Sequence, residues 1–292
     1  MHGWDWRSNQ DADNETRRRV HDLLKRRMAG DAPGVLDYFA DDVEISHNGA
    51  TVGYFPTGQW RGREALRENL RRTDIEYEPL DAEVRSVLVE GAAAALHCVA
   101  NWRRRATGRV YAMDMAYFLR WRKDKIVRMH EFIDHHAASR AVDPPGSLEK
   151  LMRAPEPGLA RDEMVQRMTD VGSFSRQGPD VALFRQYCSP DVVCEFVGDR
   201  SKIFYAGRHR GIDALTNIIR TVGMEFEQVG GAAPEMIVDG GALAVRRSVE
   251  WRHRGTGRRG VVDLANFVRF EDGMIVELVE FRDNVALLQM QG

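Results

Sequence analysis

The sequence predicts an α+β domain that is present twice in tandem, because the chain repeats itself and each copy has helical patterns followed by strand patterns. Residue i of the first half matches residue i+149 of the second. In the clearest stretch, residues 102–134 against 251–283, 15 of 33 positions are identical without a gap. Solenoid and propeller repeats span only about 20–50 residues, so a repeat of this length is a whole domain.

Each copy begins with helices. In the first copy, apolar residues recur at helical spacing over residues 16–28, and the pattern stops at Gly30. We expect a second, short helix at residues 33–39 and a third at residues 63–72, directly after Trp60-Arg61-Gly62. The apolar segment 43–45 between them has the composition of a strand.

Strands follow the third helix. We expect them at residues 82–90, 94–105, 109–122 and 125–134. The segments 106–108 and 123–124 have the composition of hairpin turns, which makes the strands an antiparallel meander. Helices followed by such a meander are typical of an α+β domain whose helices pack on one face of the sheet.

The repeat also sets the expected domain boundaries. They are an extension at 1–15, a first domain at 16–140, a linker at 141–158 and a second domain at 159–292. The linker segment holds four prolines and few apolar residues, a composition typical of semi-rigid linkers.

Composition argues against several classes of protein. A net charge of −2, with no long basic run, does not favour nucleic-acid binding. No segment has the ~20 consecutive apolar residues that cross a bilayer, and the first residues lack the apolar core of a signal peptide. None of the three cysteines has a mate at i+149, so we expect neither disulfides nor a zinc site. We therefore expect a cytoplasmic protein with no nucleic-acid or membrane partner.

Several motifs carry a family resemblance. They are F-A-D-D-V at 39–43, W-R-G-R-E-A-L at 60–66, K-I-V-R-M-H-E-F-I-D at 125–134 and F-E-D-G-M-I-V-E-L-V-E-F-R-D at 270–283. Both halves resemble the SnoaL-like branch of the nuclear-transport-factor-two-like superfamily. The resemblance implies a cone: three N-terminal helices packed on a curved, mainly antiparallel sheet that encloses a pocket. It also implies that the two domains pack on each other as homodimers of this family do, with further homo-oligomers an open question.

The resemblance also implies which residues line the pockets. The catalytic carboxylate of the resembling enzymes falls on Glu131, and on Glu280 in the second copy. Alternation along the strands then turns further side chains inward. In the first copy these are Cys98, Trp102, Met113, Met115, Tyr117, Met129 and Ile133, and in the second they include Arg247, Trp251 and Asn266. A mostly apolar lining with one carboxyl suits a hydrophobic small molecule.

Three residues of the first copy are expected to be catalytic. Glu131 in an apolar cavity should have a raised pKa and act as a general acid or base, although it could equally be a residue of the fold. His47 falls where ketosteroid isomerases keep a proton-shuttling Asp, whereas the second copy has Phe196 there. Tyr117 falls where those enzymes stabilise an oxyanion, and the second copy has Asn266.

The sequence departs from the enzymes it resembles. The Tyr that isomerases keep on the first helix is Leu23 here, and Gly172 in the second copy. Of the Asp–Arg–Asp set of epoxide hydrolases, the second copy has Arg247, which we expect to pair with Glu280. Asp114 and Asp263 match between the copies but should point to the outer sheet face. His130, His135 and His136 match no metal-ligand spacing, so we expect no metal and no cofactor.

We therefore expect an enzyme that transfers protons on a hydrophobic small molecule in the first domain: an isomerase, cyclase, dehydratase or epoxide hydrolase. Two alternatives stay open. One is a protein that binds an apolar metabolite without converting it, and the other is an interaction scaffold whose cones are filled by their own side chains. The volume of the cavities distinguishes the scaffold from the other two.

Overall fold

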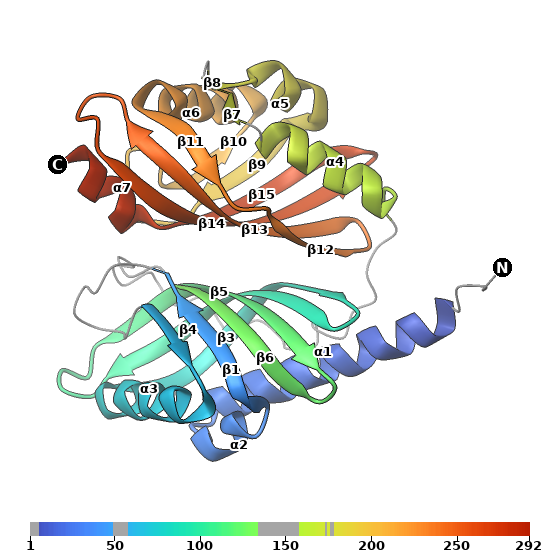
Figure 1. The fold of residues 1–292 in the computed structure, drawn as a ribbon, viewed down its shortest axis with the longest axis vertical. Coiled ribbons are helices and arrows are strands. Elements are labelled where there is room, and N and C mark those ends of the chain that lie inside the picture. Colours follow the sequence, from blue (N-terminus) through green and yellow to red (C-terminus); the bar gives the residue numbers. More distant parts are fainter. Residues whose placement is uncertain (1–5, 49–57, 134–157, 173, 176–177) are drawn as a thin grey trace. The chain divides into compact units, whose positions relative to one another are not determined.

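The computed structural model describes residues 6–48, 58–133, 158–172, 174–175 and 178–292 (Figure 1). The chain divides into two compact units, Met1–Ala154 and Pro155–Gly292, called here the N-terminal and the C-terminal unit. Each unit has helices packed on its own open sheet, so the predicted α+β duplication is confirmed. The expected linker lies outside the described residues, except for Gly158.

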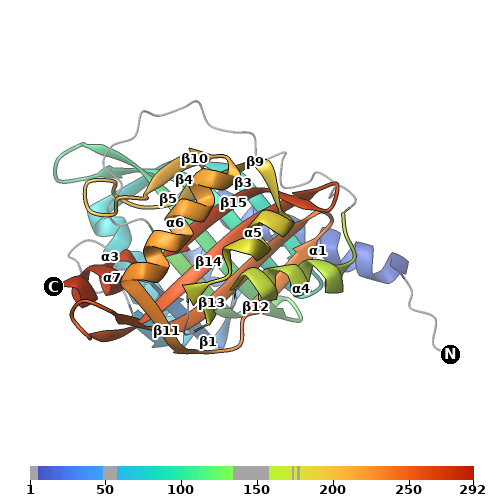
Figure 2. The same ribbon diagram turned by 90° about the horizontal axis from the view of Figure 1, so that it is seen from above.

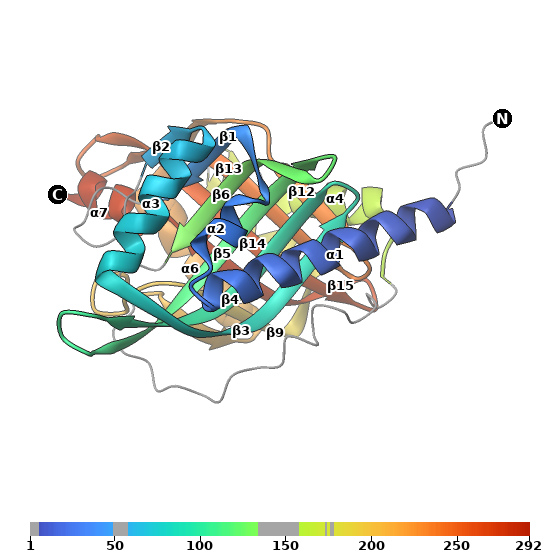
Figure 3. The ribbon, with the colours of Figure 1, turned by 90° about the horizontal axis from the view of Figure 1, so that it is seen from below.

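The described part of the N-terminal unit has three helices on a six-stranded sheet. Its elements are α1 (Trp6–Met28), α2 (Ala32–Leu36), β1 (Phe39–His47), β2 (Gly58–Arg61), α3 (Arg63–Glu76), β3 (Tyr77–Glu90), β4 (Ala93–Arg104), β5 (Val110–Arg122) and β6 (Lys125–Ile133). The strand order is β2-β1-β6-β5-β4-β3, and only the β1–β6 pair is parallel. Helices α1, α2 and α3 all lie on one face of this sheet (Figure 3).

The C-terminal unit repeats this plan with a few additions. Its elements are α4 (Arg161–Gly172), β7 (Phe174–Ser175), β8 (Gly178–Pro179), α5 (Val181–Tyr187), β9 (Cys188–Phe196), β10 (Gly207–Arg210), α6 (Ile212–Glu225), β11 (Phe226–Gly231), β12 (Glu235–Asp239), β13 (Ala242–His253), β14 (Arg259–Glu271), β15 (Met274–Arg282) and α7 (Asn284–Gln291). The order of the main sheet is β10-β9-β15-β14-β13-β11, with β12 also paired to β13. Helices α4, α5 and α6 cover one face of it (Figure 2).

Several of the repeated polar and glycine positions have local structural roles. Asp31 caps α2 by accepting a hydrogen bond from Gly34 N at 3.0 Å, and Asp180 caps α5 by accepting one from Ala182 N at 3.0 Å. Gly62 and Gly211 precede α3 and α6 with φ of 94° and 93°. Such positive φ values are strained for residues with a Cβ, so the W-R-G motif needs its glycine.

The structure corrects two of the predicted element boundaries and adds a helix that was not predicted. Helix α1 begins at Trp6, inside the expected extension, where the polar sequence offers no apolar periodicity. Strand β3 begins at Tyr77, directly after α3. Pro79 does not end the strand, because β3 lies at the edge of the sheet, where a proline is tolerated. Helix α7 was not predicted; Asp283 caps it by accepting hydrogen bonds from two backbone N–H groups.

The core of each unit lies between the helices and the sheet face that they cover. In the N-terminal unit, Val20 and Leu24 of α1 and Leu66 and Leu70 of α3 are buried against strand residues such as Val43. Each buried aliphatic side chain stabilises the fold by about 1.5–3 kcal/mol. The cavity of the unit lies within this same layer, so helices and strands both contribute to its lining.

Candidate functional site

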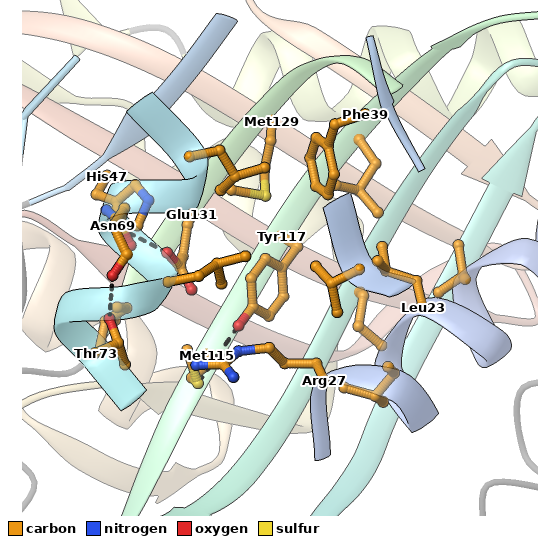
Figure 4. A pocket seen from close by; sticks show the side chains of 18 of the residues that line it. Leu23, Arg27, Phe39, His47, Asn69, Thr73, Met115, Tyr117, Met129 and Glu131 are labelled. Atoms are coloured by element: carbon orange, nitrogen blue, oxygen red, sulfur yellow. Dashed lines mark hydrogen bonds and ion pairs between the residues drawn. The ribbon is translucent and has the colours of Figure 1, made fainter. Parts of the chain in front are cut away.

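Three neighbouring strands of the N-terminal unit bring His47, Glu131 and Tyr117 together. His47 lies opposite Glu131 in the parallel β1–β6 pair, and Tyr117 lies opposite Glu131 in the antiparallel β5–β6 pair. Residues opposite each other in a sheet point to the same face. The three side chains therefore form a row beneath the helices (Figure 4).

The His47 imidazole is held by Glu131 and by an aromatic ring. His47 Nδ1 lies 2.7 Å from Glu131 Oε2, and the two side chains are 6% and 9% exposed. Trp60 meets the imidazole edge to face, with ring centroids 4.9 Å apart. Among the described residues, the buried Nε2 of His47 has no hydrogen-bond partner. The second ring nitrogen is thus available to a molecule in the cavity.

The pKa of Glu131 is lowered, so the predicted rise is wrong. Burial raises this pKa, but the charge and hydrogen bond of His47, the hydrogen bond of Tyr117 and the charge of Arg27 together outweigh burial. The prediction considered only the apolar cavity and missed the partners that the strand register supplies. Glu131 is therefore a carboxylate at neutral pH.

Tyr117 remains a hydroxyl donor at neutral pH. Burial, followed by the negative charge of Glu131, raises its pKa well above the usual value. Its hydroxyl lies 3.6 Å from the sulfur of Met115. A buried phenol that keeps its proton can donate a hydrogen bond to an oxyanion in the cavity.

Arg27 also lines the cavity, and the sequence analysis missed it. Its Nη1 lies 2.9 Å from Asp74 Oδ1, and its guanidinium lies over the ring of Trp102, 4.8 Å from the centroid. Figure 4 shows the guanidinium beside Tyr117. Arg27 follows Leu23 by four residues, so the two share one face of α1. A cation on the apolar face of an amphipathic helix was the signal that could have identified it.

The rest of this cavity is mainly apolar and small. Its volume is about 90 Å³, below the ~300–1,000 Å³ of typical ligand pockets. Of the predicted lining residues, four face the cavity, whereas Cys98 and Met113 are buried in the core beside it. The four are Trp102, Met115, Met129 and Ile133. On α3, the unpredicted Asn69 also lines it, and within the described structure its buried Nδ2 has no hydrogen-bond partner.

The C-terminal unit has a different cavity at the equivalent place, with a volume of about 190 Å³. All five residues expected in the second pocket line it: Phe196, Arg247, Trp251, Asn266 and Glu280. Here Phe196 lies opposite Glu280, as His47 lies opposite Glu131 in the other unit. This cavity therefore lacks the histidine of the first.

The expected ion pair between Arg247 and Glu280 is replaced by another. Arg282, the neighbour of Glu280 on the same face of β15, bonds its carboxylate and also donates to the hydroxyl of Tyr205 at 2.8 Å. Asn266 Nδ2 donates to the other carboxylate oxygen at 2.9 Å. Arg247 instead donates to the carbonyl oxygen of Gly172 at 2.7 Å. Alternation along the last strand predicts that Arg282 points inward with Glu280, but the sequence pattern did not predict that Arg282, rather than Arg247, would bond the carboxylate.

Other predicted features lie away from the cavities. Asp114 contacts Nε2 of His97 at 3.2 Å, and Asp263 accepts a hydrogen bond from Ser248; neither aspartate lines a cavity. His130 bonds Ser46. His135, His136 and Asp134 lie outside the described residues. In the part of the chain that the structure describes, no three His, Cys, Asp or Glu side chains are placed to hold a metal ion.

Comparison with known proteins identifies the family. The model of the SnoaL-like domain matches residues 18–129 and again residues 165–278. The chain belongs to the SnoaL-like family. Among curated proteins, none matches it.

Solved structures similar to this SnoaL-like protein include several NTF2-like proteins. One from Burkholderia xenovorans is 26% identical, with 43% of this chain and 91% of that chain covered and a TM-score of 0.35. One of unknown function from Burkholderia pseudomallei is 22% identical, with 44% and 96% covered and a TM-score of 0.38. A provisionally assigned SnoaL-like polyketide cyclase from Mesorhizobium loti is 24% identical, with 39% and 95% covered and a TM-score of 0.33.

The two SnoaL-like domains thus differ in the chemistry that their cavities offer. The N-terminal cavity has an imidazole, a carboxylate, a phenol and a guanidinium. The C-terminal cavity has one carboxylate and two guanidiniums, with no titratable imidazole among its lining residues in the described structure. No described helix is long and apolar enough to span a bilayer.

Proposed function

We propose that the N-terminal unit is an acid–base enzyme that transfers a proton on a small hydrophobic carbonyl compound. The observation that carries this proposal is the buried Nε2 of His47, which has no partner among the described residues while Nδ1 is held by Glu131. A carboxylate that fixes one nitrogen of an imidazole orients the other and stabilises the imidazolium that forms.

In the first step, Nε2 of His47 removes a proton from the carbon next to the carbonyl. The electron pair of the broken C–H bond moves onto the carbonyl oxygen and gives an enolate. Tyr117 donates a hydrogen bond to this oxygen, and Arg27 supplies positive charge beside it (Figure 4). Donors fixed in advance around a developing oxyanion are among the largest contributions to catalysis.

In the second step, the imidazolium returns the proton. Return to a different carbon isomerises the substrate, whereas attack of the enolate on a second carbonyl closes a ring and the imidazolium then protonates the new alkoxide. Both outcomes leave His47 and Glu131 in their starting states. The cavity of about 90 Å³ admits a small molecule or the reactive end of a larger one.

One alternative is a protein that binds such a molecule without converting it. The cavity and its apolar lining suit a binder as well, but a binder needs no base oriented by a carboxylate. A scaffold would need filled cones, and the cavity of each unit favours a ligand-binding function instead.

A nitrobenzisoxazole is a suitable probe, because a base that removes its ring C–H breaks the N–O bond and releases a coloured cyanonitrophenolate. We expect the full chain to accelerate this reaction above free imidazole, and His47→Ala to lose at least about 100-fold, the lower range for a positioned general base. His130→Ala, on the neighbouring strand and away from the cavity, is the matched control. Equal rates for the wild type and His47→Ala would reject the proposal.

A further inference from the structure

We infer that the C-terminal cavity is a separate binding site for a small hydrophobic carboxylate, which Arg247 and Arg282 hold. This inference concerns the other unit and does not depend on the proposed enzymatic function.

The charges that line this cavity do not balance. Its charged residues are Arg247, Arg282 and Glu280. Glu280 is already bonded by Arg282 and by Asn266. One positive charge is therefore left over in a cavity whose other lining is mostly apolar, and burying an unpaired charge is costly. A bound monoanion neutralises it.

Hydrogen-bond donors are also left over. Within the described structure, the buried Nε atoms of Arg247 and Arg282 have no hydrogen-bond partner. Arg282 is only 8% exposed, so solvent has little access to it. Leaving a buried N–H group without a hydrogen-bond partner is costly. Carboxylates are acceptors only and suit guanidinium donors in both charge and geometry.

The position of Arg247 depends on a glycine. Its Nη1 bonds the carbonyl oxygen of Gly172, and a Cβ at that glycine would lie 2.7 Å from Nη1. In the N-terminal unit, the residue equivalent to Gly172 is Leu23, and the residue equivalent to Arg247 is Cys98. Two changes relative to the other copy thus combine to bring a guanidinium into this cavity.

The electrostatics of Arg247 support an anionic ligand. Burial lowers its pKa; Glu280 acts against this, whereas the positive charge of Arg282 lowers it further. A negative charge next to Arg247 would oppose both of these effects and favour the charged guanidinium.

The apolar residues that line the rest of the cavity determine which hydrophobic group of the ligand fits. Trp251, Phe196, Met236 and Val249 all face the cavity, which holds about 190 Å³. An aromatic ring or a short branched chain fits these surroundings. Since Phe196 replaces the histidine of the other unit, we expect binding here without turnover.

Benzoate is the first probe, and calorimetric titration of the full chain is the measurement. We expect benzoate to bind, and its neutral isostere benzamide to bind at least about tenfold more weakly. Arg247→Met should weaken benzoate binding by at least about tenfold, the effect of losing one hydrogen bond to a charged group. Gly172→Ala, which keeps Arg247 but displaces its guanidinium, should weaken binding in the same direction. Arg269→Met, an exposed change on β14, is the control.

Three results would overturn the inference. The first is that benzoate at millimolar concentration gives no heat of binding. The second is that the wild type and a folded Arg247→Met variant bind benzoate with equal affinity. The third is that Arg27→Met abolishes benzoate binding, whereas Arg247→Met does not. The last result would place the benzoate in the N-terminal cavity.

Discussion

Replacing Glu131 by Gln tests how the carboxylate acts in the proposed proton transfer. The change keeps the size of the side chain and an oxygen that can accept from Nδ1 of His47, but it removes the negative charge that lies 2.7 Å from that atom. If Glu131 orients His47 and stabilises its charged form, Glu131→Gln should slow the reaction while the fold is kept.

The size of the effect follows from this contact. A hydrogen bond to a charged group is worth about 1.4 kcal/mol more than a neutral one, and two charges about 4 Å apart interact by about 4 kcal/mol at the effective dielectric constant of protein sites. Each 1.36 kcal/mol changes a rate tenfold. We therefore expect the rate with nitrobenzisoxazole to fall between about tenfold and a thousandfold.

The assay is the initial rate of phenolate release by the wild type, by Glu131→Gln and by a control. Glu44→Gln is that control, because Glu44 is an exposed carboxylate on β1 paired with Arg128. Circular dichroism and thermal unfolding check the fold of each variant. A folded Glu131→Gln variant with the wild-type rate, alongside an inactive His47→Ala, would refute a role of Glu131 in positioning His47.

Three further predictions concern stability. The folded pKa of Glu131 lies below its usual 4.5, so the stability that its ionised form contributes is fully present above about pH 4.5 and is lost as the pH falls through the lower folded value. The free energy of unfolding of the wild type in urea should therefore approach that of Glu131→Gln in acid. A difference between the two that stays constant with pH would contradict this. Asp283→Ala should lower the free energy of unfolding by about 1 kcal/mol, since α7 loses its cap; an unchanged urea midpoint would show that the cap contributes nothing. Gly62→Ala should cost about 1–2 kcal/mol because of the positive φ, and unaltered urea unfolding would contradict the strain argument.

Much of the fold could be predicted from the sequence. The repeat at i+149 fixes the duplication, and the hairpin turns between long apolar strands fix the antiparallel meander. Element ends were less predictable, because they depend on packing and capping. The polar start of α1 has no apolar periodicity, and the capping role of Asp283 becomes visible only when the backbone of α7 is seen.

The candidate site was predictable only in part. Alternation along the strands places Glu131 and Tyr117 on one face, but their pairing with His47 depends on the parallel β1–β6 register, which sequence spacing does not give. The predicted rise in the pKa of Glu131 failed for this reason. In the C-terminal unit, Arg282 rather than Arg247 forms the ion pair with Glu280, because Arg282 lies two residues from Glu280 on the same face of the strand.

A crystal structure of the full chain with the cyanonitrophenolate product bound would test whether His47 and Glu131 carry out acid–base chemistry in the N-terminal cavity. We expect the product in the N-terminal cavity, with its phenolate oxygen at Tyr117 and Arg27 and its ring within reach of Nε2 of His47. Product bound only in the C-terminal cavity, or an N-terminal cavity closed by its own side chains, would contradict the assignment of acid–base chemistry to His47 and Glu131.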